Sequence, residues 1–206
     1  MLLVALSLIV FGAASGAQPA PVQAAGSLPE CRYDDVSTPH ASTGDWPITL
    51  LDTIYMVSSS YRPPGLVSTS KAGLNKGGYV RRVMLGDLTA LARAAREAGN
   101  DLRVVSAYRS YRVQRALFNR EVRTKGLRAA RESVARPGHS EHQLGTTIDF
   151  GSANSSKKGW HYSDWAKSPA GAWLKAHGWR YVGREMAADI RASGLTLREY
   201  LWRHYH

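Results

Sequence analysis

Arg136-Pro-Gly-His-Ser-Glu-His142-Gln-Leu-Gly145-Thr-Thr-Ile-Asp149-Phe150 places two imidazoles and two carboxylates in one short run. Imidazole and carboxylate together suit Zn²⁺, whose catalytic sites use three protein ligands and keep one position open. His142 and Asp149 are seven residues apart, so a single straight strand would point them to opposite faces. A turn at Gly145 would bring them together. The run therefore predicts a metal-binding pair, with a loop histidine and a turn-capping aspartate as the alternative.

Three blocks of the chain resemble one family. Ser140-Glu-His-Gln-Leu-Gly-Thr-Thr-Ile-Asp149 is similar to the SxHxxGxxxD signature of VanY-type D-alanyl-D-alanine carboxypeptidases, which are zinc peptidases of the bacterial wall. Ser106-Ala-Tyr-Arg-Ser-Tyr-Arg-Val-Gln-Arg-Ala-Leu-Phe118 is similar to the family's SxYRSYxxQxxLF block. Trp179-Arg-Tyr-Val-Gly183 matches a block near the C-terminus, so the resemblance covers residues 46–201. It implies a zinc D,D-peptidase-like fold that acts on peptidoglycan stem peptides.

The resemblance also implies roles for individual residues. His142 and Asp149 would hold Zn²⁺. Arg109 would polarise the scissile carbonyl and stabilise the oxyanion. The guanidinium group, with its planar fork of N–H donors, suits this role better than the ammonium group of lysine. Gln114 would bind the substrate backbone, with ordering of its own helix as the alternative. Ser140 would contact the substrate peptide.

The sequence departs from the family near residue 175. VanY-type enzymes carry an ExWH motif before the C-terminal block, whose glutamate is the general base and whose histidine is the third zinc ligand. Aligned on that block, Lys175 and Gly178 stand at these two positions, so the segment with the motif is missing. His177 is the nearest candidate for the third ligand, and the last turn of a helix is its alternative role. Three interpretations therefore remain open. The protein is an active carboxypeptidase, or it is a catalytically degenerate binding or regulatory module, or the missing segment is an artefact of the sequence.

Composition and the N-terminal residues indicate how the chain is divided into segments and a domain. The chain has 206 residues, of which 44% are hydrophobic, enough for one core. Residues 2–15 are apolar and small residues follow, which predicts a secretory signal peptide, although no basic residue precedes them. That lack leaves a misplaced start codon or an uncleaved membrane anchor as alternatives. We predict a signal peptide and linker at 1–26, an extended lead-in at 27–44 and a carboxypeptidase-like domain at 45–206.

The net charge of +11 indicates an anionic partner or a generally basic surface. Export argues against nucleic acid and favours an anionic wall polymer. We therefore expect a monomer, secreted or held in the bacterial cell envelope, with peptidoglycan stem peptides as its partner.

Periodicity predicts an α+β fold with helices packed on a small antiparallel sheet. Asp45 and Pro47 predict a helix over 46–57, and apolar spacing predicts a second over 82–98. Residues 102–106 and 146–150 predict strands, the latter ending near Asp149. A further helix is expected at 111–124, with Val113 facing inward, followed by a helical turn at 128–134. Three more helices are expected, one from 168 onward, one at 184–193 and one at 196–202.

Overall fold

The computed structural model describes residues 28–153, 167–177 and 181–206, without the side chains of residues 175–177. The predicted signal peptide at 1–26 and residues 178–180 of the C-terminal block lie outside this part. Within the described ranges, no helix combines the length and hydrophobicity that a membrane span requires.

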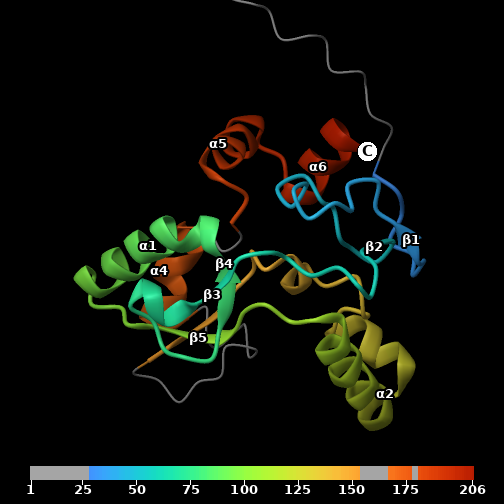
Figure 1. Ribbon diagram of the computed structural model, residues 1–206, viewed down its shortest axis with the longest axis horizontal. Helices are drawn as coiled ribbons and strands as arrows, with labels where there is room; N and C mark the ends of the chain where they lie inside the picture. The colour runs from blue at the N-terminus through green and yellow to red at the C-terminus, as the bar shows by residue number, and fades with distance from the viewer. Residues whose placement is uncertain (1–27, 154–166, 178–180) are drawn as a thin grey trace, which may run out of the picture.

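The described residues form short strands, short 3-10 helices and five α-helices, which confirms the predicted α+β class (Figure 1). In chain order these elements are β1 (Val36–Ser37), β2 (Tyr55–Met56), β3 (Leu66–Ser68), η1 (Thr69–Ala72), β4 (Tyr79–Arg81), η2 (Arg82–Met84), α1 (Leu85–Glu97), β5 (Leu102–Ser106), α2 (Tyr111–Ser133), η3 (Glu141–Leu144), β6 (Asp149–Ser152), α4 (Pro169–His177), α5 (Arg184–Ser193) and α6 (Leu197–Tyr205).

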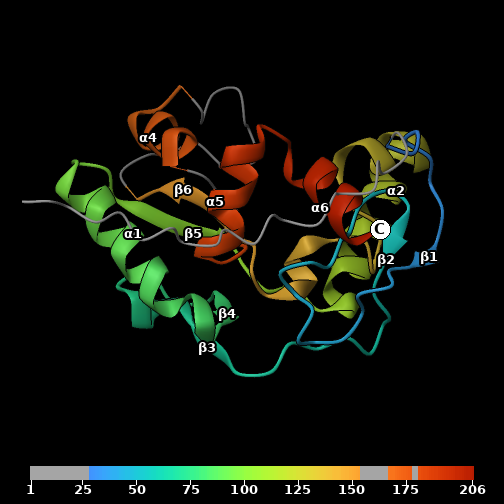
Figure 2. The same cartoon turned by 90° about the horizontal axis from the view of Figure 1, so that it is seen from above.

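The main hydrophobic core lies around the antiparallel pair β5–β6. Val104 of β5 pairs with Phe150 of β6, and both side chains are buried. Helices α1 and α4 contribute further buried residues to this core, including Leu88 and Leu174, and they lie beside the strand pair (Figure 2). The antiparallel pair β3–β4 joins the same core, whereas β1–β2 is a parallel pair at the other end of the molecule. The predicted small antiparallel sheet with helices on it is confirmed.

The predicted helix over 46–57 is wrong. Asp45 starts only a single turn, in which its carbonyl accepts from the backbone N–H groups of Ile48 and Thr49, both at 2.9 Å. Asp52 then starts a second turn, because its Oδ1 accepts from the N–H groups of Ile54 at 2.7 Å and Tyr55 at 2.9 Å. Leu50, Ile54 and Val57 are buried at a helical spacing, yet the segment folds into turns, so tertiary packing overrides both the capping signal and the apolar spacing.

The lead-in is paired with the body of the protein through β1. Backbone N–H groups of Val36 and Thr38 donate to the carbonyls of Ile54 and Met56, at 3.0 and 2.9 Å. At the other end of the chain, the Nε2 of His40 lies 2.8 Å from the carbonyl oxygen of Tyr205, which brings the C-terminus beside β1 and β2 (Figure 1). The division of the chain at residues 44 and 45 stays a prediction.

Helix α2 joins the two helical segments expected at 111–124 and 128–134. Gly126, with φ of 80°, breaks the helical geometry between them, and the two pieces form a hairpin that projects from the molecule (Figure 1). The prediction that Val113 faces inward is wrong, because its side chain is 48% exposed. The residues that this helix buries are Gln114, Phe118 and Ala130.

The last three helices begin where the sequence predicts. The hydroxyl of Ser168 accepts from the N–H of Gly171 at 3.1 Å at the start of α4. Thr196 and Glu199 form a capping box at the start of α6. Helix α6 buries Tyr200 and Leu201, whereas α5 buries no residue and lies on the surface.

Candidate metal and carboxypeptidase site

The segment from η3 to β6 links two hydrophobic clusters. Leu144 is fully buried in a cluster with Leu51, Val57 and Tyr61, and Phe150 is buried in the main core. The turn predicted at Gly145 is present, with φ of 75°. Strand β6 begins at Asp149 rather than ending near it, which corrects the predicted extent of this strand. Both ends of the segment are therefore anchored by burial, and the turn between them sets the positions of the candidate ligands.

His142 and Asp149 face one another as predicted. The Nε2 of His142 lies 3.1 Å from the Oδ2 of Asp149. The His142 side chain is 8% exposed, whereas that of Asp149 is 51% exposed, so the pair opens to solvent on the carboxylate side. This arrangement brings an imidazole nitrogen and a carboxylate oxygen to one accessible point.

The backbone fixes which nitrogen of His142 faces Asp149. Nδ1 donates to the carbonyl of Ala107 at 2.7 Å, because a carbonyl oxygen can only accept. In the neutral ring Nε2 then carries the lone pair. Two acceptors at 3.1 Å require a proton or a cation between them, and a backbone carbonyl on the other nitrogen is the usual support of a metal-binding histidine. These residues therefore fit a metal ion.

The charges around Asp149 favour its ionised form. Partial burial works against ionisation, but the contact with His142 and the nearby charge of Arg109 outweigh it and lower the pKa of Asp149. An ionised carboxylate is the state that binds a cation.

Arg109 lies beside this pair, in the loop between β5 and α2. Its backbone N–H donates to the carbonyl of His142 at 3.1 Å. Burial lowers the pKa of Arg109, and the charge of Asp149 acts in the opposite direction. The Nε–H of Arg109 is buried and has no hydrogen-bond partner within the described ranges. Arg109 therefore offers a donor near the ligand pair, as its predicted role requires.

Arg81 supports the turn and was missed by the sequence analysis. It is 5% exposed, and its Nε donates to the carbonyl of Leu144 at 2.7 Å. Its backbone N–H donates to the carbonyl of Gly145 at 2.9 Å, and its Nη2 donates to the hydroxyl of Tyr61 at 2.9 Å. No motif singles out this arginine, because its role depends on the contact between β4 and the turn.

Gln114 and Ser140, the predicted substrate-binding residues, are both buried. The Nε2 of Gln114 donates to the carbonyl of Ala135 at 2.7 Å, which ties α2 to the start of the next loop. This bond supports the alternative that Gln114 orders its helix. Ser140 precedes η3 and is 3% exposed. Substrate contact by either residue stays a prediction.

The third metal ligand is not found in the described part of the chain. Within that part, no group of three or more histidine, cysteine, aspartate or glutamate side chains is arranged to hold a metal ion. His177 is the last residue of α4, and its side chain lies outside the described part. Its role as a ligand, and the loss of the ExWH segment, stay predictions.

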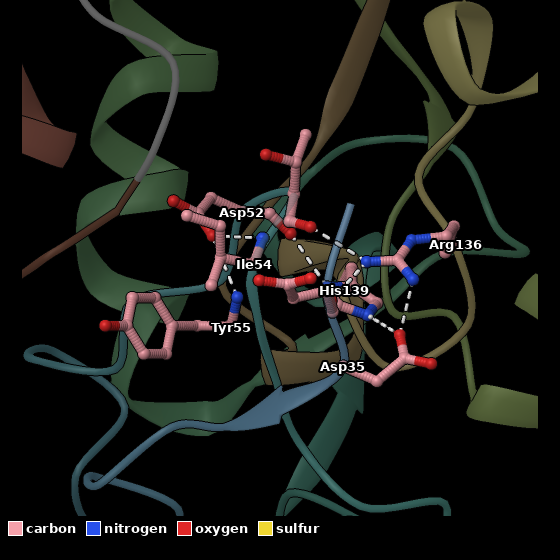
Figure 3. Close-up of polar contacts among 8 residues, drawn as sticks. Asp35, Asp52, Ile54, Tyr55, Arg136 and His139 are labelled. Atoms are coloured by element: carbon pink, nitrogen blue, oxygen red, sulfur yellow. Dashed lines mark hydrogen bonds and ion pairs between the residues drawn. The ribbon is translucent and has the colours of Figure 1, made fainter. Parts of the chain in front are cut away.

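A second polar cluster holds the loop before His142 (Figure 3). The Nδ1 of His139 donates to the carbonyl of Asp52 at 2.9 Å, and its Nε2 lies 3.0 Å from the Oδ1 of Asp35. Arg136 pairs with the same carboxylate and donates to the carbonyl of Thr53 at 2.8 Å. His139 and Arg136 thus tie the loop to both the lead-in and the turn before β2.

The carboxylate of Asp52 extends this cluster to α6. Its Oδ2 accepts from the Nε of Arg198 at 2.7 Å. Burial acts against its ionisation, but the backbone N–H groups of Tyr55 and Ile54 and the guanidinium of Arg198 lower the pKa of Asp52 below its ordinary value. The loop that leads to His142 is therefore held by segments from both ends of the chain.

Comparisons with known proteins identify the family to which the chain belongs. A model of the VanY D-alanyl-D-alanine carboxypeptidase family matches residues 77–184, more than half of the chain. The chain belongs to the VanY family of D-alanyl-D-alanine carboxypeptidases, as its motifs predict. The matched segment contains Arg109, His142 and Asp149.

Individual relatives support the same assignment. YodJ of Bacillus subtilis (strain 168), which is named as a carboxypeptidase, is 31% identical over 184 residues, covering 74% of this chain and 66% of YodJ. The chain thus spans slightly less than two thirds of that relative. The structure of the LdcB LD-carboxypeptidase matches with a TM-score of 0.66 and 28% identity, over 76% of this chain and 87% of LdcB. A mutant of the D,D-pentapeptidase VanY in complex with Zn(II) matches with a TM-score of 0.57 and 26% identity, over 76% and 99% of the two chains.

Proposed function

We propose that the protein is a zinc-dependent carboxypeptidase that removes the C-terminal D-alanine from peptidoglycan stem peptides. The observation that carries the proposal is the pairing of His142 with Asp149, in which the bond to Ala107 leaves Nε2 free to bind a metal ion. The family and the Zn(II) complex of VanY support the choice of zinc and substrate.

Each candidate site residue has a role that follows from its chemistry. His142 and Asp149 would hold the metal ion, and His177 is proposed as the third ligand. When bound, zinc supplies a Lewis acid that polarises a carbonyl group and lowers the pKa of a water molecule. Arg109 would donate to the oxygen that gains negative charge, because its Nε–H is buried near the pair and free to do so among the described residues. Gln114 and Ser140 would position the peptide.

The proposed substrate implies a location outside the cytoplasmic membrane. Peptidoglycan lies there, and the apolar residues 2–15 fit an export signal or a membrane anchor. We propose a monomer that is secreted or held in the cell envelope, with the carboxypeptidase domain at residues 45–206 and an extended lead-in at 27–44.

Release of D-alanine from two soluble stem peptides tests this function. One peptide ends in D-alanyl-D-alanine, and the other ends in a single D-alanine after an L-centre, which distinguishes D,D- from L,D-cleavage. We expect release from one of them, its loss after chelation and its recovery on addition of Zn²⁺. Release that chelation does not change would contradict a metal mechanism, and no release from either peptide would contradict the activity.

A further inference from the structure

Helix α2 carries a row of four arginines on its exposed side. Arg112, Arg115, Arg120 and Arg123 are all exposed. With 3.6 residues per turn, they fall within about 140° of the helix circumference and extend along about 16 Å of its axis. The buried residues Gln114 and Phe118 lie on the opposite side. We call these four residues the arginine face.

Among the described residues, no carboxylate forms an ion pair with the arginine face. The ion pairs that α2 does form are made by other residues, namely Lys125 with Glu121 at 2.8 Å and Arg128 with Glu132 at 3.5 Å. Within the part of the chain that the structure describes, none of the four arginines forms an ion pair. Lys125 and, to a smaller extent, Arg120 lower the pKa of Glu121, but that carboxylate pairs with Lys125. The face therefore presents a row of guanidinium groups that form no ion pair within the described ranges.

One end of this face lies next to the candidate active site. Ser110 caps α2, and Arg109, whose backbone binds that of His142, directly precedes the cap. A pocket of about 370 Å³ lies at this end. Its lining includes the hydroxyl-bearing residues Ser59, Ser60, Ser110 and Tyr111 together with Arg62 and Arg112. The face thus leads from a polar, cationic pocket beside Arg109 along the projecting hairpin.

We propose that the arginine face docks peptidoglycan itself, through carboxylates of stem peptides that neighbour the one being cleaved. This inference rests on the proposed function, because each uncleaved stem peptide ends in a free carboxylate. Guanidinium groups bind carboxylates in bidentate fashion. A single exposed ion pair contributes little, but several pairs to one polymer act together and raise the local concentration of stem peptides at the site.

Cosedimentation of the full-length protein with purified sacculi tests the docking without requiring turnover. The sacculi are first stripped of covalently attached phosphate polymers. Changing all four arginines of the face to glutamine should weaken binding by about tenfold at low salt, and added salt should weaken binding of the unchanged protein. Changing the four to lysine keeps the charge and should retain binding. Equal melting temperatures of the variants check that the fold is intact.

A matched control removes the same charge elsewhere. Arg82, Arg93, Arg191 and Arg203 are exposed on other elements, and changing these four to glutamine should leave most of the binding. Equal loss in the control and the face variant would show a general charge effect and overturn the inference. Binding by the glutamine variant of the face at the level of the unchanged protein would also overturn it, as would binding to unstripped sacculi alone, since phosphate polymers would then be the partner.

The rate measurement separates this inference from the proposed function. The ratio of kcat/KM on the polymer to kcat/KM on a soluble pentapeptide should fall in the glutamine variant of the face. If no preparation releases D-alanine while the face still determines sacculus binding, the proposed activity fails and the docking stands. If D-alanine is released but the arginine face affects neither sacculus binding nor the ratio of the two kcat/KM values, the docking inference is wrong and the proposed activity stands.

Discussion

The Nδ1–H of His142 donates to the carbonyl of Ala107 at 2.7 Å, and this bond directs the Nε2 of the same ring toward Asp149. The residue that follows β5 therefore sets the orientation of a side chain in η3. The same loop carries Arg109, so one short connection positions both the candidate ligand and the candidate oxyanion donor.

Replacement of His142 by alanine should abolish metal retention, because it removes the Nε2 that faces Asp149. Elemental analysis after dialysis measures the effect. The control is His204→Ala, which removes an exposed histidine of α6 and should retain the metal ion. Unchanged metal content in the His142 variant would show that this residue is not a ligand.

Replacement of Arg109 by alanine should leave the metal content intact and lower kcat by roughly 10²–10³-fold, as loss of an oxyanion donor does in other hydrolases. D-alanine release and metal content are measured on the same sample. Arg93→Ala, on the exposed side of α1, serves as the control. Turnover equal to that of the unchanged protein would remove Arg109 from the mechanism.

Gly145→Ala should destabilise the protein by about 1–3 kcal/mol, because φ of 75° disfavours any side chain. An added Cβ would also lie 3.1 Å from the Cγ of Pro63 and 3.2 Å from the Cδ2 of Leu66. Chemical denaturation measures the loss. Gly86→Ala is the control, since its Cβ would meet no atom within 4 Å and its φ is not positive. Equal stability of the two variants would show that the turn tolerates a side chain.

Asp52→Asn should lower the free energy of unfolding by about 1–3 kcal/mol near neutral pH, because the charge bound by Arg198 is lost. The pKa of Asp52 is lowered in the folded state from its ordinary value of 3.8, so ionisation stabilises the fold. This stabilisation is complete above the ordinary pKa and is lost as the pH falls through the lowered one. The difference between the two proteins should therefore shrink below about pH 4. A difference that stays constant down to pH 2 would contradict the assignment.

Removal of residues 1–44 should destabilise the domain more than removal of residues 1–27. The longer truncation deletes Asp35, which pairs with His139 and Arg136, and the backbone bonds of β1. Thermal unfolding compares the two truncated proteins. Equal melting temperatures would show that the lead-in is dispensable and that the domain begins at residue 45.

The predicted features that the structure confirms are those marked by a local signal in the sequence. The Thr196–Glu199 capping box and the Ser168 cap mark helix starts that the structure contains. Gly145 marks the turn, and the facing of His142 and Asp149 follows from it. These signals depend on residues that are close in the sequence.

The predictions from sequence fail where contacts between residues that are far apart in the chain determine the structure. Asp45 and Pro47 indicate a helix, but burial of the following segment against the lead-in and η3 leaves only turns. The role of Arg81 depends on the approach of β4 to the turn, and that of Asp52 on its pairing with Arg198 of α6. Periodicity and caps contain no information on such pairings.

The most direct test of the account is the zinc content of the purified protein, determined together with D-alanine release from a pentapeptide stem on the same sample. The account predicts one zinc ion per chain and release of D-alanine, with both lost in the His142→Ala variant. A folded protein without zinc and without release would contradict it, since the pair of His142 and Asp149 would then bind no catalytic metal ion.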